Sequence, residues 1–211
     1  MNFMYDIEAI ALQYGYYPSS HHQLSDCRVM FLDVGYLHAS VFEVEYKRDQ
    51  PFKILFCSNS TKVGGKFVDQ ILVEYVLQVL KRDYNIDEQI IFNSPRDMAA
   101  IQSACEKAKT YFCTEGIQST NISFSLQCDD EQDISIDIHY DEFLSLCSKH
   151  SIFETITSLC ENCLTQCEGA DYIILEGSSS RFYEVIRSLN RLIPLLSLKT
   201  TPRIKWLVFK A

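Results

Sequence analysis

The sequence predicts an α/β protein in which a second, α+β unit interrupts the first. Three observations predict this class. The segment CRVMFLDV at 27–34 is an almost continuous apolar run, which is typical of a strand buried on both faces. Apolar residues alternate with polar ones in the next strands but recur at helical spacing after Gly64-Gly65. A second buried run, YIIL at 172–175, ends in a turn of small residues that leads into a helix.

A helix is predicted first, over 4–15, because Gly15 and Pro18 are helix stop signals. Three strands follow after a polar loop. Since only short turns join these strands, a meander is the simplest topology. The strands cover 27–34, 39–46 and 51–58.

The middle of the chain is predicted to begin with two helices. The first follows Gly64-Gly65 and continues to about Arg82. The second begins at Ser94-Pro95, because this pair is typical of an N-cap followed by proline at the first helical position. The remaining elements are strands over 121–128 and 133–140, joined by the acidic turn DDEQ, helices over 140–148 and 151–167, the strand 172–175 and a helix over 180–193.

This order indicates two units, one inserted into the other. Residues 1–27 form a connecting helix and loop. Residues 28–64 and 151–195 share one sheet as the core unit, and residues 65–150 form the inserted α+β unit. The last segment, 196–211, fits neither unit and is treated as a divergent tail.

Composition excludes several classes of function. The net charge of −9 and the lack of a basic stripe argue against a nucleic-acid surface. No apolar run approaches the roughly 20 residues that a membrane span needs. The N-terminus carries Asp6 and Glu8 where an export signal would be positively charged. Nine cysteines without regular spacing favour reduced thiols, so we expect a cytoplasmic protein.

Three of the cysteines are close together in SLCENCLTQC. Cys160, Cys163 and Cys167 share one helix face. A zinc site would need a fourth ligand and usually a second close pair. The sequence therefore favours small apolar residues that pack a buried helix face over a metal site.

Four stretches, in order, match a known pattern. Residues 33–38 (DVGYLH) match D-L-G-G-G-T, and Gly64-Gly65-Lys66 followed by Asp69 matches G-G-x-x-F-D. Residues 104–113 (ACEKAKTYFC) match A-C-E-R-A-K-R-x-x-S, and residues 175–183 (LEGSSSRFY) match L-V-G-G-S-T-R-I-P. Together they resemble the second lobe of the nucleotide-binding domain of the 70-kDa heat-shock chaperone family, and most of all its 110-kDa branch. The resemblance implies an actin-like ATPase, that is a ribonuclease H-like, lobe.

The resemblance also implies a site for ATP or ADP with Mg²⁺. It assigns phosphate and ribose contacts to Asp33, Gly35, Tyr36, Gly64, Gly65 and Lys66. It assigns adenosine contacts to Glu106, Lys109, Gly177, Ser178, Ser179 and Arg181. It implies no catalytic residue and no protein ligand to a metal.

Several positions depart from the family pattern. Tyr36 and Leu37 stand where glycines would let the backbone approach a phosphate. Thr110 replaces an arginine, which removes a stacking contact of roughly 1–2 kcal/mol. Plain structural interpretations also remain open. Gly64-Gly65 would also suit a hinge before a helix, Glu106 and Lys109 a surface ion pair, and Ser180 a helix N-cap.

The leading hypothesis is a partial ATP-binding domain of a 110-kDa-type chaperone, which takes part in protein folding as a co-chaperone or nucleotide exchange factor. Its implied partner is a 70-kDa heat-shock chaperone. ATP hydrolysis by this chain alone is not expected, because the first lobe has no counterpart here, and the exposed lobe-facing surface predicts self-association. The alternative is a nucleotide-free interaction module or a truncated product without activity. An independent enzyme of the wider actin and sugar-kinase superfamily is least favoured, since it needs a catalytic Asp on an earlier strand.

Overall fold

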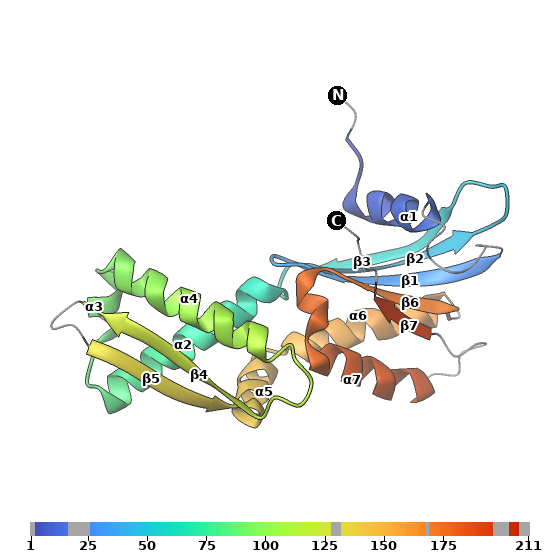
Figure 1. Cartoon of the computed structure of the whole chain (residues 1–211). Helices are drawn as coiled ribbons and strands as arrows, with labels where there is room; N and C mark the ends of the chain where they lie inside the picture. Colours follow the sequence, from blue (N-terminus) through green and yellow to red (C-terminus); the bar gives the residue numbers. More distant parts are fainter. Residues whose placement is uncertain (1–2, 17–25, 128–131, 168, 196–202, 207–211) are drawn as a thin grey trace.

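A computed structural model describes residues 3–16, 26–127, 132–167, 169–195 and 203–206. The chain forms a five-stranded sheet with helices on both faces and, beside it, a unit of helices and a two-stranded sheet (Figure 1). The acidic turn predicted at 129–132 lies largely outside the described residues.

The five-stranded sheet is mixed, with the strand order β3-β2-β1-β6-β7. The first three strands are an antiparallel meander, as predicted, whereas β6 pairs with β1, and β7 with β6, in parallel. The strands are β1 (Cys27–Val34), β2 (Ala39–Tyr46), β3 (Lys53–Ser60), β6 (Tyr172–Glu176) and β7 (Arg203–Trp206). The predicted bounds of β1 and β2 are confirmed, and β3 begins two residues later than predicted.

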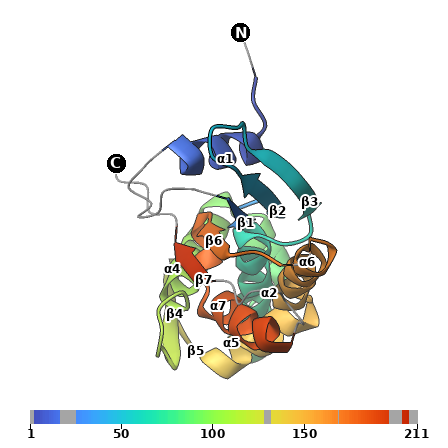
Figure 2. The same cartoon turned by 90° about the vertical axis from the view of Figure 1, so that its right-hand side faces the viewer.

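The two faces of this sheet bury different sets of side chains, as the period of two along a strand requires. On one face, Phe31 of β1 stacks on Phe42 of β2 at 4.9 Å, and Tyr14 of helix α1 (Asp6–Tyr16) meets Phe31 edge-on. The other face carries Met30 and Leu32 into the larger core, under helices α6 (Ile152–Gln166) and α7 (Tyr183–Leu192). Figures 1 and 2 show α1 on one side of the sheet and α6 and α7 on the other.

The second unit consists of helices and one β-hairpin. Local signals mark the two ends of its helix α4 (Pro95–Tyr111). Ser94 caps helix α4, since its Oγ accepts a hydrogen bond from the Asp97 N–H and Pro95 follows. Phe112 stacks on Phe143 of α5 at 4.5 Å and ties this end of α4 to the core. The elements are α2 (Gly65–Asp83), α3 (Glu88–Phe92), α4 (Pro95–Tyr111), β4 (Ser119–Leu126), β5 (Gln132–His139) and α5 (Tyr140–Lys149).

Three predictions about local structure were wrong or incomplete. The short helix α3 was missed. The helix predicted over 180–193 begins only at Tyr183, because residues Ser178–Arg181 form a 3₁₀ turn, η1. Ser180 is not an N-cap, since its hydroxyl donates to the Gly177 carbonyl at 2.7 Å inside that turn. A second 3₁₀ turn, η2 (Ile193–Leu195), ends the last helix.

The tail also differs from expectation. Arg203–Trp206 add the edge strand β7 to the main sheet, although the sequence placed 196–211 in neither unit. The sheet joins strands from 27–60 and from 172–206, while the division into units at residues 64 and 150 stays a prediction.

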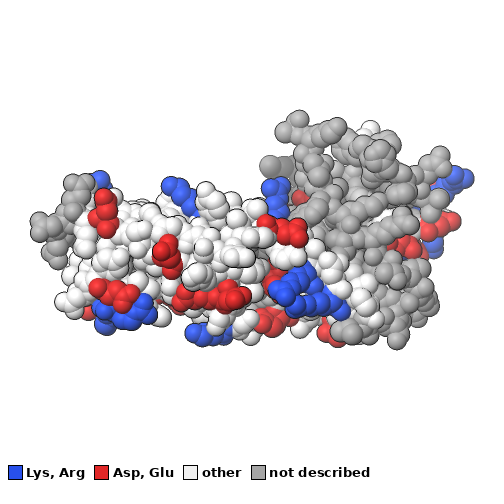
Figure 3. All heavy atoms as spheres, turned by 60° about the horizontal axis from the view of Figure 1, so that its bottom comes forward, with Lys and Arg blue, Asp and Glu red and all other residues white. Residues whose placement is uncertain are grey.

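No helix within the described residues is both long and apolar enough to cross a membrane. On the face shown in Figure 3, acidic and basic side chains are interspersed over the described part of the surface.

Candidate functional site

Three turns meet at the carboxyl ends of β1 and β6. The first is the hairpin after Asp33, the second is Gly64–Gly65 at the start of α2, and the third is η1. Asp33 lies opposite Glu176 in the parallel register of β1 and β6. The hairpin is closed by a hydrogen bond from the Gly35 N–H to the His38 carbonyl at 3.0 Å. Ligands of α/β proteins commonly bind at this edge of a sheet.

Gly64 and Gly65 are tightly enclosed by the neighbouring turns. A Cβ at position 64 would lie 2.7 Å from the Tyr36 carbonyl oxygen, and the φ angle of Gly64 is +149°. A Cβ at position 65 would lie 2.6 Å from Oγ of Ser179 and 3.5 Å from Nζ of Lys109. Position 64 has no room for a side chain against the Tyr36 backbone, and the missing side chain at position 65 leaves space for those of Ser179 and Lys109. The two glycines thus let the three turns and α4 come together.

Gly177 has the same role at the end of β6. Its φ angle is +79°, and a Cβ there would collide with the Val34 carbonyl oxygen and lie 2.5 Å from Oδ1 of Asp33. Ser178 next to it is exposed, whereas Ser179 is buried against Gly65. Of the residues predicted to contact phosphate and adenosine, Gly177 therefore lies beside Asp33, and Ser179 beside Gly65.

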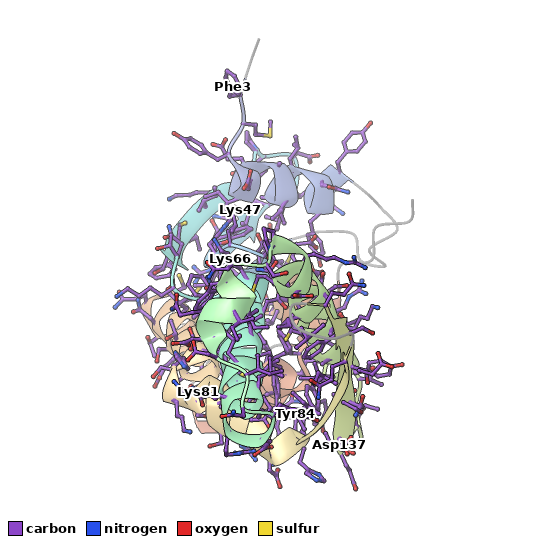
Figure 4. The ribbon with its side chains drawn as sticks, turned by 90° about the vertical axis from the view of Figure 1, so that its left-hand side faces the viewer. Phe3, Lys47, Lys66, Lys81, Tyr84 and Asp137 are labelled. Atoms are coloured by element: carbon purple, nitrogen blue, oxygen red, sulfur yellow. The ribbon has the colours of Figure 1, made fainter. Side chains whose placement is uncertain are left out.

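The first N–H groups of α2 already have partners. The Gly65 N–H donates to the Gly35 carbonyl at 3.1 Å, and the Lys66 N–H donates to the Tyr36 carbonyl at 2.9 Å. The Lys66 side chain is exposed at this end of the helix, while Lys81 and Tyr84 lie toward the other end (Figure 4). The hairpin thus takes donors that a phosphate could otherwise accept from.

Lys109 is an inward-facing residue of α4. Its Nζ lies 2.7 Å from Oδ2 of Asp69 on α2, and the two side chains are only 11% and 15% exposed. Nζ also lies 5.6 Å from the centre of the Tyr36 ring. Burial raises the pKa of Asp69, and the Lys109 ammonium opposes that shift. The surface ion pair between Glu106 and Lys109 that the sequence left open does not form, because Lys109 pairs with Asp69 across on α2.

Glu106 is exposed one helical turn from Lys109. It lines a hollow of about 460 Å³ on the outer face of α4. The other lining residues are Ser103, Lys107, Thr110, Tyr111 and Thr114. Arg181 is exposed. Burial raises the pKa of the Cys113 thiol to about 11, and the charges of Lys109 and Arg181 oppose this rise, so the end of η1 approaches the end of α4.

The sequence analysis missed a second carboxyl group at the site. Burial raises the pKa of Glu176 to about 7, and the charge of Asp33 adds to this effect, while the Gly177 N–H opposes it. One carboxyl oxygen of Glu176 is buried and has no hydrogen-bond partner among the residues that the structure describes. Burial also raises the pKa of Asp33, and His38 lowers it. The available signal was a glutamate where the family motif reads valine.

Comparisons with known proteins place the chain in a family. The model of the Hsp70 protein family matches residues 2–197. Heat shock 70-related protein 5 of Dictyostelium discoideum is 26% identical over 90% of this chain and 37% of its own length. Heat shock 70 kDa protein 14 of Arabidopsis thaliana is 24% identical over 90% of this chain and 22% of its own length.

Human heat shock 70 kDa protein 4 is 24% identical over 70% of this chain and 17% of its own length. The chain thus spans well under half the length of these relatives. The mixed sheet with helices on both faces is the α/β architecture of an actin-like ATPase, as predicted. Because the family model matches residues 2–197, nearly the whole chain, the chain belongs to the Hsp70 family.

Proposed function

We propose that this chain is the second lobe of an Hsp70-type nucleotide-binding domain of the 110-kDa branch. In this role it is a cytoplasmic partner of a 70-kDa heat-shock chaperone and acts in protein folding as a co-chaperone or nucleotide exchange factor. The observation that carries the proposal is the convergence at Gly65, where Tyr36, Lys109 and Ser179 all come within reach of one backbone position.

ATP or ADP with Mg²⁺ is the ligand that this reading implies. Asp33, Gly35, Tyr36, Gly64, Gly65 and Lys66 would face the phosphates and ribose. Glu106, Lys109, Gly177, Ser178, Ser179 and Arg181 would face the adenosine. These residues fit such a ligand in part, since the turns and the inward-facing Lys109 are grouped at one edge of the sheet.

Three features of the site predict weak affinity. The N–H groups of Gly65 and Lys66 donate to the hairpin carbonyls instead of a ligand. The Lys109 charge is already paired with Asp69. Glu176 places a second carboxyl beside Asp33, where it would repel phosphate when ionised.

Titration calorimetry of the chain with ATP or ADP and Mg²⁺ tests the proposal. We expect weak but saturable binding and no measurable turnover. A submicromolar dissociation constant or steady hydrolysis by the isolated chain would contradict it.

A variant of Tyr36 makes this test specific to the site. The Tyr36→Gly change removes an exposed ring that lies over Gly65 and beside Lys109, so it gives the backbone room near a phosphate. We expect adenine-nucleotide affinity to rise several-fold. The matched control is Phe3→Gly, an exposed aromatic position outside the site, which should leave affinity unchanged. Equal affinities in wild type and Tyr36→Gly would count against a nucleotide at this edge.

The alternative, a nucleotide-free interaction module, is favoured by the same paired donors. It predicts capture of a 70-kDa chaperone by this chain at equal strength with and without nucleotide. Under the leading proposal, ATP or ADP changes that capture. No association under either condition would reject the shared idea of a chaperone partner.

A further inference from the structure

A group of possible metal ligands lies away from the candidate nucleotide site, beneath the middle of the main sheet. The carboxylate of Glu43 on β2 and the thiols of Cys163 and Cys167 on and just after α6 all lie within 4.8 Å of one another. All three residues are buried. The sequence favoured simple packing for these cysteines because no further ligand was visible; the fold brings Glu43 from more than a hundred residues away.

Glu43 is an unusual residue for its position. It is fully buried, and both its carboxyl oxygens lack a hydrogen-bond partner within the described part of the chain. An isolated buried carboxylate is costly unless it is paired or coordinates a metal. A buried carboxyl without a partner therefore indicates a position where a ligand could bind.

Local backbone structure directs this side chain to the cysteines. The pairing of β2 with β3 is irregular between Glu43 and Val44, and such bulges re-aim a side chain. Glu43 lies opposite Met30 on β1, and Met30 belongs to the core on the α6 side of the sheet. The helix supplies the two thiols from positions four residues apart, which lie on one face.

We propose that Glu43, Cys163 and Cys167 form a binding site for a divalent metal ion of the zinc class. Two thiolates and one carboxylate suit Zn²⁺ better than Mg²⁺ or Ca²⁺, which prefer oxygen ligands alone. Bond lengths of about 2.0–2.3 Å put the ligand atoms of a tetrahedral zinc roughly 3.5–3.8 Å apart. The observed limit of 4.8 Å lies about 1 Å above that, so small rotamer changes would close the site.

The surroundings suit the charge that results. Binding releases the two thiol protons to solvent, so Zn²⁺ with two thiolates and a carboxylate carries a net charge of −1. The Arg28 guanidinium is next to this group, since its Nη1 donates to the Cys167 carbonyl at 3.0 Å. Arg28 thereby holds the end of α6 in place, and its positive charge, which it shares with Glu45 at 3.6 Å, offsets part of the charge of the site. Water would complete the tetrahedron.

Cobalt is the probe for this proposal. The reduced full-length chain is stripped with a chelator and titrated with Co²⁺, then with Zn²⁺. We expect a thiolate-to-cobalt charge-transfer absorption that saturates at one ion per chain and disappears when Zn²⁺ displaces Co²⁺. Wild-type chain that develops no such absorption at saturating Co²⁺ would overturn the proposal, whether or not any variant folds.

Variants locate the ion. Cys163→Ser and Glu43→Gln should each weaken cobalt binding by at least about tenfold, because each removes a ligand. The matched control is Cys160→Ser, an equally buried thiol on the same helix but outside the group, which should keep the absorption. Loss of the absorption in Cys160→Ser, with Cys163→Ser unaffected, would place the metal elsewhere and refute the site.

Discussion

Replacing Glu176 with glutamine tests the electrostatics of the site directly. Burial and Asp33 raise the pKa of this carboxyl from 4.5 to about 7 in the folded chain. The folded protein holds this proton more tightly than the unfolded chain does. The contribution of Glu176 to the free energy of unfolding is therefore fully present below about pH 4.5. That contribution is lost as pH rises through about 7. Glutamine keeps the shape of the protonated acid and cannot ionise.

The magnitude follows from the two pKa values. Taken in full, the two values would destabilise the folded state by about 3 kcal/mol at roughly pH 8 and by about 1 kcal/mol at roughly pH 5. Glu176 is only half-buried, so solvent screens part of this cost. We therefore expect Glu176→Gln to raise the free energy of unfolding by roughly half of these amounts.

Urea denaturation at the two pH values measures both gains. The control is Glu74→Gln, at an exposed position of α2, which should change stability by less than about 0.5 kcal/mol. A gain of the same size at both pH values would refute the reasoning, because it would not come from ionisation. A loss of stability at the higher pH would refute it as well.

Two further predictions concern how the turns are held together. Lys109→Met leaves the Asp69 carboxylate without its 2.7 Å partner and should cost about 3 kcal/mol in urea denaturation. Adding Asp69→Leu should recover most of that loss; no recovery would mean that the ion pair is not the cause. Gly177→Ala should lower Tm far more than Gly116→Ala, because both positions have positive φ angles but only position 177 is also crowded. Equal losses of Tm would show that the collision with the Asp33 turn does not cause the effect of Gly177→Ala.

Local signals were sufficient to predict much of the fold. The buried run of β1 and the alternation of β2 gave correct strand bounds, and Ser94-Pro95 gave the start of α4. The helix α3 has only five residues, too few for helical periodicity to appear, although Asp87 caps it. The turn η1 was predicted to be the start of a helix. It forms a 3₁₀ turn instead, because serine hydroxyls that bond to nearby backbone, as Ser180 does, favour such turns over a regular helix start.

At the two sites, contacts between segments that are distant in the sequence could not be predicted. Lys109 was matched with Glu106, its neighbour on the same helix, because the alternative partner Asp69 lies on another helix and 40 residues away. The burial of Glu43 has the same explanation. Along β2 this residue alternates with apolar ones like any solvent-facing glutamate, but in the fold α6 packs on β2 and brings Cys163 within 4.8 Å of it.

Packing explains most of the glycines of this site, so their presence is no evidence for a bound ligand. A Cβ at position 64 or 177 would meet the backbone of another turn at 2.7 Å or closer, and both positions have positive φ angles, so the fold itself requires glycine there. At position 65 the nearest atom is the side-chain Oγ of Ser179, so glycine there leaves room for neighbouring side chains. Position 35 is different, since a Cβ there would make only an ordinary contact, and Tyr36 and Leu37 beside it are exposed. The hairpin thus carries large side chains where the fold leaves space and only a ligand would need the room. The glycines identify the fold, whereas we expect Tyr36, Leu37 and Glu176 to set the affinity for phosphate. Tyr36→Gly, and no replacement of a glycine, is therefore the informative variant for nucleotide binding.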